Sequence, residues 1–324
     1  MKEVVFVNRN KERWKEFDSM ASSGKKQDPD VLADLFIQVL NDLSYARTFY
    51  PKGNVPGYLN QLAFKAHQLI YKNKKEKRSR ILSFWKYEFP LEFLKNQKYF
   101  YYSCIIFFIS LFIGLFSAAL DDTYVRLILG DQYVNLTIEN IKNGDPMAIY
   151  KHMTGTESFI RIWFNNAYVT IQVFALGLIF SVGAAMALMY NGIMIGAFQY
   201  FFYAEGHLAD SMSIIWLHGT IEIFSILVAG GAGLMIGNSL MFPGTYPRLH
   251  SLKVSAVNAL KLVIGILPFI TVAAFIEGYV TRHTHMPWIL RIMIIGGSVV
   301  MLYYYFFIYP RILKTKQYGK QCKL

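Results

Sequence analysis

Three acid–base side chains lie inside long apolar stretches of this sequence. His218 and Glu222 are four residues apart within Trp216–Ile223, and Glu277 lies within Ala274–Val280. Residues four apart on an α-helix share a face, so His218 and Glu222 should point the same way. Ionisable groups are costly inside a bilayer, so they mark functional sites by default. The pattern predicts one intramembrane polar cluster that contains all three side chains.

Three asparagines are expected to extend this cluster. Asn165 and Asn166 begin another apolar stretch, at the depth predicted for the two glutamates, and Asn191 lies in the short connection that follows this stretch. Their amides can satisfy buried carboxylates and imidazole nitrogens. We therefore include all three among the candidate site residues.

The cluster allows three kinds of chemistry. It can be a structural hydrogen-bond network, in which each interhelical bond contributes ~0.6 kcal/mol on average. It can be a proton site or a divalent metal site, because the donor types of His218, Glu222 and Glu277 match those of zinc. It can also contact a substrate or a lipid headgroup. The spacing His-x-x-x-Glu does not decide among them, because it is not the metalloprotease pattern His-Glu-x-x-His.

Membrane helices are the elements that must position these residues. Apolar side chains make up 54% of the 324 residues, and a helix needs ~20 of them in succession to cross a bilayer. An all-α fold with about six spans is expected: Tyr99–Leu120, Trp163–Ala187, Ile193–Tyr203, Met212–Phe242, Ala256–Val280 and Trp288–Tyr309. The second and third spans are expected to form a tight hairpin through Leu188–Gly192.

The domain organisation follows from the same hydropathy pattern. Residues 1–97 are polar with helical apolar stripes, which predicts a cytoplasmic helical bundle that ends in an interfacial amphipathic helix. Residues 98–310 form the predicted transmembrane domain, with an outer loop at 121–161. Residues 311–324 are a basic cytoplasmic tail.

Basic residues predict the orientation. Residues 1–98 contain 19 Lys and Arg against 11 Asp and Glu, whereas residues 121–161 contain 4 against 6. Basic segments stay on the cytoplasmic side of bacterial inner-membrane proteins. With six spans, both termini are expected in the cytoplasm. The net charge of +12 is therefore a topology signal, and we expect no nucleic-acid partner.

Several short stretches carry a family resemblance. They are Trp14, Asp42-Leu43-Ser44-Tyr45-Ala46-Arg47, Tyr58-Leu59-Asn60, His67, Tyr71, Phe164-Asn165-Asn166, Asn191-Gly192-x-x-x-Gly196, His218-Gly219-x-x-Glu222 and Ile276-Glu277-Gly278. In these the chain resembles the stage II sporulation protein M family of membrane proteins. The resemblance implies a role like that of the founding member, which recruits and anchors peptidoglycan-degrading partners during forespore engulfment.

Our first hypothesis is a non-enzymatic membrane component that anchors or assembles a cell-envelope complex. Its expected partners are membrane lipids and envelope or peptidoglycan-remodelling proteins. The alternatives are an intramembrane hydrolase that uses a divalent metal such as zinc, and a small transporter; both would use the His/Glu cluster. The pairs Gly192/Gly196 and Gly233/Gly237 permit close helix packing, within the monomer or in a homodimer.

Overall fold

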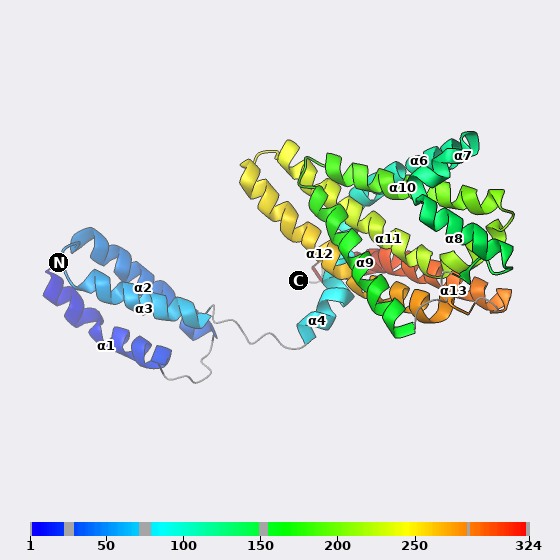
Figure 1. The fold of residues 1–324 in the computed structure, drawn as a ribbon. Coiled ribbons are helices and arrows are strands. Elements are labelled where there is room, and N and C mark those ends of the chain that lie inside the picture. Colours follow the sequence, from blue (N-terminus) through cyan, green and yellow to red (C-terminus); the bar gives the residue numbers. More distant parts are fainter. Residues whose placement is uncertain (1, 23–28, 71–78, 149–154, 284–285, 322–324) are drawn as a thin grey trace. The chain divides into compact units, whose positions relative to one another are not determined.

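The computed structural model describes residues 2–22, 29–70, 79–148, 155–283 and 286–321, and every regular element in these ranges is helical. The prediction of an all-α chain is therefore confirmed. Tyr71, part of the predicted outer loop and the last three residues of the tail lie outside these ranges. The chain divides into two compact units, and the boundary in the sequence falls between Arg80 and Ile81 (Figure 1).

The first unit contains α1 (Glu3–Ser22), α2 (Pro29–Phe49) and α3 (Val55–Ile70). Each contributes apolar side chains to one core: Phe6, Trp14, Phe17, Val39, Leu43, Ala46, Leu59, Leu62 and Ala63. The indole Nε1 of Trp14 donates to Asp42 Oδ2 at 2.8 Å, and Arg13 pairs with the same oxygen at 2.5 Å. This carboxylate therefore links α1 to α2 at the edge of the core.

In its described residues, the second unit has five helical runs that are long and apolar enough to cross a membrane. They are α6 (Gln97–Leu120), α10 (Val182–Ala204), α11 (Leu208–Met241), α12 with η3 (Arg248–Phe275, Ile276–Thr281), and α13 with η4 and the start of α14 (Trp288–Tyr303, Tyr304–Ile308, Tyr309–Gln321). The chain is thus a multi-pass membrane protein. A further long helix, α9 (Gly155–Leu176), is not among these runs. Polar residues such as Arg161, Asn165 and Asn166 lower its mean hydropathy.

The predicted second and third spans are wrong in their boundaries. Leu188–Gly192 lies in the middle of α10, and the chain turns instead at residues 177–181, between α9 and α10. Phe180 and Ser181 take the left-handed conformation there, with φ of 47° and 66°. The hydroxyl of Ser181 donates to the carbonyl of Leu234 in α11 at 3.0 Å. This bond holds the strained turn against α11.

Glycines let the helices of the second unit pack backbone to backbone. A Cβ on Gly192 or Gly196 of α10 would lie 2.5 Å from the carbonyl oxygen of Phe107 or 2.1 Å from that of Leu111, both in α6. These glycines are therefore used for packing within one chain. α11 is the central helix, since 72% of its most apolar stretch is buried, against 28% for α6.

The segment that precedes α6 packs into the second unit. It contains α4 (Ser79–Ser83), η1 (Phe84–Glu88) and α5 (Phe89–Lys95). Phe89 and Phe93 are buried against Phe306, and Trp85 Nε1 donates to the carbonyl of Gly265 at 3.0 Å. The first unit therefore ends earlier than the expected residue 97. Phe89 and Phe93 of this segment contact protein, whereas Ile81 and Leu82 are exposed, so its expected place at the membrane interface stays a prediction.

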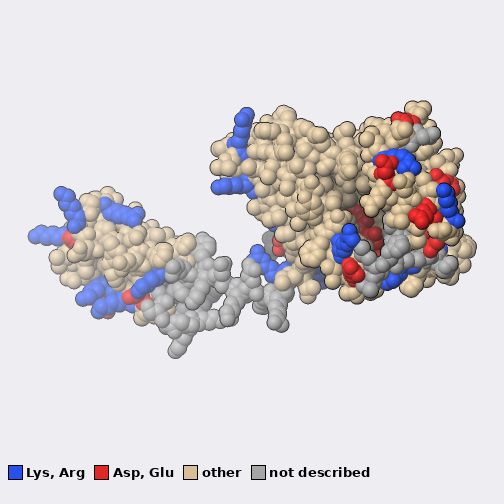
Figure 2. All heavy atoms as spheres, viewed as in Figure 1, with Lys and Arg blue, Asp and Glu red and all other residues tan. Residues whose placement is uncertain are grey.

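Two short helices follow α6 on the connection to α9. They are α7 (Asp122–Leu129) and α8 (Asp131–Lys142), and Asp121 caps α7 by accepting from Thr123. Val125 and Val134 pack with Phe201 of α10. In the second unit, Figure 2 shows basic side chains at the end where α11 joins α12, acidic and basic side chains near α7 and α8, and a largely uncharged surface between.

Candidate functional site

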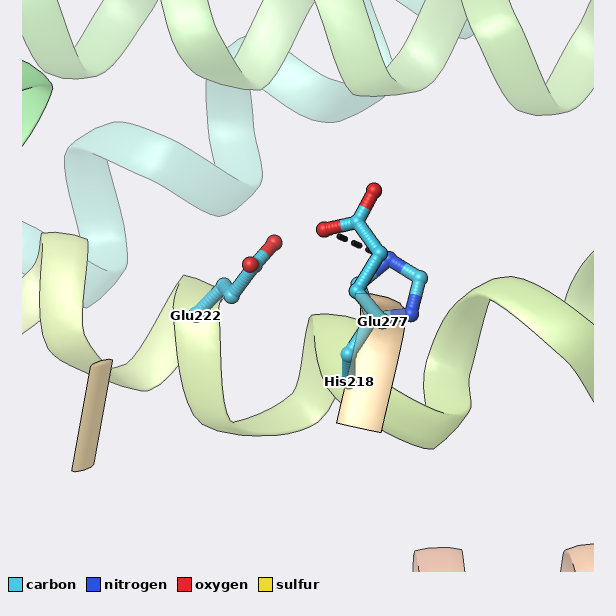
Figure 3. Close-up of side chains that lie close together, drawn as sticks. All are labelled: His218, Glu222 and Glu277. Carbon is cyan, nitrogen blue, oxygen red and sulfur yellow. Dashed lines mark ion pairs between the residues drawn. The ribbon is translucent and has the colours of Figure 1, made fainter. Parts of the chain in front are cut away.

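His218 and Glu222 project from one face of α11, as their spacing predicts (Figure 3). Gly230, Gly231, Gly233 and Gly237 further along allow this helix to sit in the centre of the unit, because a Cβ at each would lie within about 3 Å of another segment. His218 is buried, and the Glu222 side chain is half-buried. The face they share is directed toward η3.

Glu277 comes from η3, a π-helical turn that continues α12. A π-turn is rare and is frequent at functional sites, because the extra residue redirects side chains. The adjacent Gly278 lets α9 approach: a Cβ at this position would lie 2.9 Å from the amide nitrogen of Phe159. The turn therefore places Glu277 next to α11, and α9 packs against the turn at Gly278.

The three side chains converge, as the sequence predicts. The Nε2 atom of His218 lies 3.7 Å from Glu277 Oε2. One donor atom from each of His218, Glu222 and Glu277 lies within 4.8 Å of the other two, and in Figure 3 the Glu277 carboxylate lies between the other two groups. The side chain of His218 is 5% exposed and that of Glu277 is 17% exposed. We call these residues the His–Glu–Glu cluster.

Thr281, which is absent from the residues expected at the site, orients the imidazole. Its hydroxyl donates to the carbonyl of Ile276 at 3.2 Å and lies 3.1 Å from His218 Nδ1. A hydroxyl has one proton to donate, so with this proton given to Ile276 it can accept from Nδ1–H of a neutral ring protonated at Nδ1. The Nε2 atom, which faces Glu277, then carries the lone pair. The spacing of four residues from Glu277 is the signal that could have indicated Thr281.

Only one of the three predicted asparagines reaches the cluster. The amide of Asn166 in α9 donates to Glu222 Oε1. Asn165 is exposed, because adjacent residues on a helix point in different directions. Asn191 donates to the carbonyl of Ala187 in its own helix at 2.8 Å. The amide of Asn166 is therefore the one that positions a carboxylate of the cluster.

The carboxylates have no basic side chain to balance them in the described part of the chain. Among these residues, no lysine or arginine nitrogen forms an ion pair with Glu222 or Glu277, and the ion pair of Glu277 is with His218. Two neighbouring carboxylates away from water cannot both stay charged without a compensating cation or proton. The cluster must therefore hold protons or bind a cation.

A comparison with protein families places the site in a known group. Residues 103–282 match the family described as Stage II sporulation protein M, and this range is more than half of the chain. The chain belongs to the stage II sporulation protein M family. The family match contains all five residues of the site, from Asn166 to Thr281. The resemblance seen in the sequence is confirmed for the stretches from Phe164 to Gly278, whereas the stretches between Trp14 and Tyr71 lie outside the matched range.

The N-terminal unit matches a second family. Residues 4–72 match a domain of unknown function, DUF8413. This range covers α1, α2 and α3, so it coincides with the unit that has its own core. No curated protein and no solved structure matches the chain.

Proposed function

We propose that this stage II sporulation protein M family member anchors an envelope complex at the membrane without itself being an enzyme. The second unit is the anchor, and the N-terminal unit binds a partner segment. The observation that carries the proposal is a groove of about 340 Å³ on the N-terminal unit. Its lining residues are Val7, Lys11, Trp14, Lys15, Asn54, Val55 and Tyr58.

The chemistry of the groove favours an acidic and apolar peptide segment. Val7, Val55 and the ring of Tyr58, which is 41% exposed, offer an apolar surface over buried Trp14. Lys11 and Lys15 are exposed, are four residues apart and share a face of α1. An apolar anchor in such a groove supplies affinity, and opposite charge on the rim supplies specificity.

The cellular setting follows from the charge pattern and the family. We propose that the protein lies in the bacterial cytoplasmic membrane, with the N-terminal unit in the cytoplasm and residues 121–161 outside. The groove then takes a cytoplasmic segment of another envelope protein. The family resemblance supports peptidoglycan-remodelling proteins as members of such a complex, reached on the outer side by α7 and α8.

Native electrophoresis of membranes from the source organism tests the proposal. Wild-type protein should migrate in a complex larger than the purified chain, and the double charge reversal Lys11→Glu with Lys15→Glu should release it. Lys52→Glu, at an exposed position outside the groove, is the matched control and should leave the complex intact. A wild-type chain that migrates alone, or a complex that survives the double reversal, would contradict the proposal.

A further inference from the structure

We propose that His218, Glu222 and Glu277 bind one divalent transition-metal ion inside the second unit. The proposal is independent of the groove and of the anchoring role. It rests on the convergence of three donor groups from two separate helical runs, α11 and η3. The ion would join these two runs at the depth where α9 also contacts them.

Charge balance is the first argument. A neutral imidazole with two carboxylates has a charge of about −2, which one dication neutralises. In the described residues, no lysine or arginine forms an ion pair with these carboxylates. Charges buried without compensation are strongly destabilising, whereas buried charges that coordinate a metal are common in proteins. A dication therefore satisfies both glutamates at once.

Geometry is the second argument. Donor atoms around zinc lie ~2.0–2.2 Å from the metal, which puts neighbouring donors about 3–3.5 Å apart. The His218 Nε2 to Glu277 Oε2 distance is 3.7 Å, and all three donors lie within 4.8 Å. Small side-chain rotations bring such atoms into a coordination sphere without moving a helix. Three protein donors leave a fourth position, on the side where Glu277 keeps 17% exposure.

The surrounding hydrogen bonds are the third argument. Metal-binding histidines usually donate their other ring N–H to an oxygen, which fixes the tautomer. Thr281 Oγ1 occupies that place at 3.1 Å from Nδ1 and leaves Nε2 as the coordinating nitrogen. Ligating carboxylates are held in turn by hydrogen bonds, and Asn166 donates to Glu222. Both supporting contacts hold the donors in the orientation that a metal requires.

The donor set indicates the class of metal. Imidazole nitrogen suits zinc, iron, nickel and copper, whereas carboxylate oxygen suits manganese as well. Magnesium and calcium prefer sites built from oxygen alone. One imidazole with two carboxylates therefore favours Zn²⁺, with Mn²⁺ as the next choice. We take Zn²⁺ as the probe.

The experiment measures metal on the full chain, purified in detergent after growth and dialysis with Zn²⁺. Elemental analysis should find about one zinc ion per chain in the wild type. Glu222→Gln, Glu277→Gln and His218→Ala should each fall to background. Thr281→Val should bind zinc about 10–100-fold more weakly, because it removes the acceptor of Nδ1–H. His207→Ala is the control; this residue contacts Asp210 at 3.3 Å, at the start of α11, and should keep full zinc.

A second measurement guards against variants that fail to fold. Each variant should elute from size exclusion as the wild type does, and Glu222→Gln changes one oxygen to nitrogen with little change in shape. Zinc should raise the thermal unfolding temperature of the wild type and of His207→Ala but not that of Glu222→Gln. Absence of zinc and manganese from the folded wild type would overturn the proposal. Equal zinc in folded Glu222→Gln and wild type would also overturn it.

Discussion

Gly237 of α11 lies directly against Ser181 of the turn between α9 and α10: a Cβ on residue 237 would be 1.9 Å from the amide nitrogen of Ser181. The same serine holds a left-handed conformation and donates to Leu234. Backbone strain of this kind persists only where the surrounding structure enforces it. The close approach of α11 therefore maintains the turn.

Gly237→Ala should destabilise the folded chain. The methyl group meets backbone atoms that cannot move aside, and overpacking of this kind costs about 1–3 kcal/mol. Thermal unfolding of the detergent-solubilised protein measures the effect. Gly297→Ala, in α13, is the matched control: no atom beyond its own stretch of helix lies within 4 Å of the place that a Cβ would take, so its unfolding temperature should equal or exceed that of the wild type. Equal unfolding temperatures for Gly237→Ala and wild type would contradict the tight contact.

Gly196→Ala should weaken the pairing of α6 with α10 within each monomer. Its Cβ would lie 2.1 Å from the carbonyl oxygen of Leu111, so the two helices must separate. The unfolding temperature should fall at every protein concentration, because the contact is intramolecular. If this glycine served a homodimer instead, the variant would lose dimer on size exclusion while the monomer kept its stability.

The termini should lie on the same, cytoplasmic side of the membrane. Five spans alone would put them on opposite sides, so this prediction requires α9 to cross as well. Its 22 residues reach about 33 Å at 1.5 Å per residue, which is enough to cross the hydrocarbon core. In a Cys104→Ala background, an impermeant thiol reagent should label Asp131→Cys in intact spheroplasts and Cys322 only after permeabilisation. Labelling of Cys322 in intact cells would rule out this topology.

The cap of α7 should depend on pH. Hydrogen bonds from the side chain and the backbone of Thr123 lower the pKa of Asp121 from its ordinary value. A lowered folded-state pKa means that the stabilisation is present above the unfolded pKa, ~3.9, and is lost as the pH falls through the folded pKa. The unfolding temperature should therefore fall with acidification less steeply in Asp121→Asn, whose amide oxygen also caps, than in the wild type. If the unfolding temperatures of the wild type and of Asp121→Asn fell equally with pH, the Asp121 carboxylate would not contribute to the pH dependence of stability.

The sequence was sufficient for the helical class, for most of the apolar membrane segments and for the three side chains that form the His–Glu–Glu cluster. Apolar length identifies a span regardless of tertiary detail, and the four-residue spacing of His218 and Glu222 follows from helix geometry alone. Glu277 could be added because a buried carboxylate needs a partner. These inferences depend only on residue types and on their spacing along the chain, and both can be read from a single sequence.

Other features depend on contacts between segments and could not be predicted. Asn191-Gly192 has the composition of a turn, yet Gly192 lies inside α10, and the lack of a side chain lets Phe107 and Ser110 of α6 lie directly beside it. The true turn contains Phe180, a residue type that rarely adopts positive φ. The choice between Asn165 and Asn166 likewise depends on the rotation of α9 about its axis, which only packing decides.

The π-turn at Ile276–Thr281 has a consequence for the spacing of the residues on either side of it. A π-turn takes up one residue beyond the α-helical repeat, so its backbone hydrogen bonds join residues five apart, and the hydroxyl of Thr281 likewise donates to the carbonyl of Ile276, five residues earlier. Deletion of one residue from this turn would restore the α-helical repeat and shorten the spacing between Ile276 and Thr281 to four residues, so the hydroxyl of Thr281 would lose its present position between the Ile276 carbonyl and His218. The orientation of the histidine ring therefore depends on the residue count of this segment, so a single-codon deletion that leaves every site residue in the protein would still misalign the site.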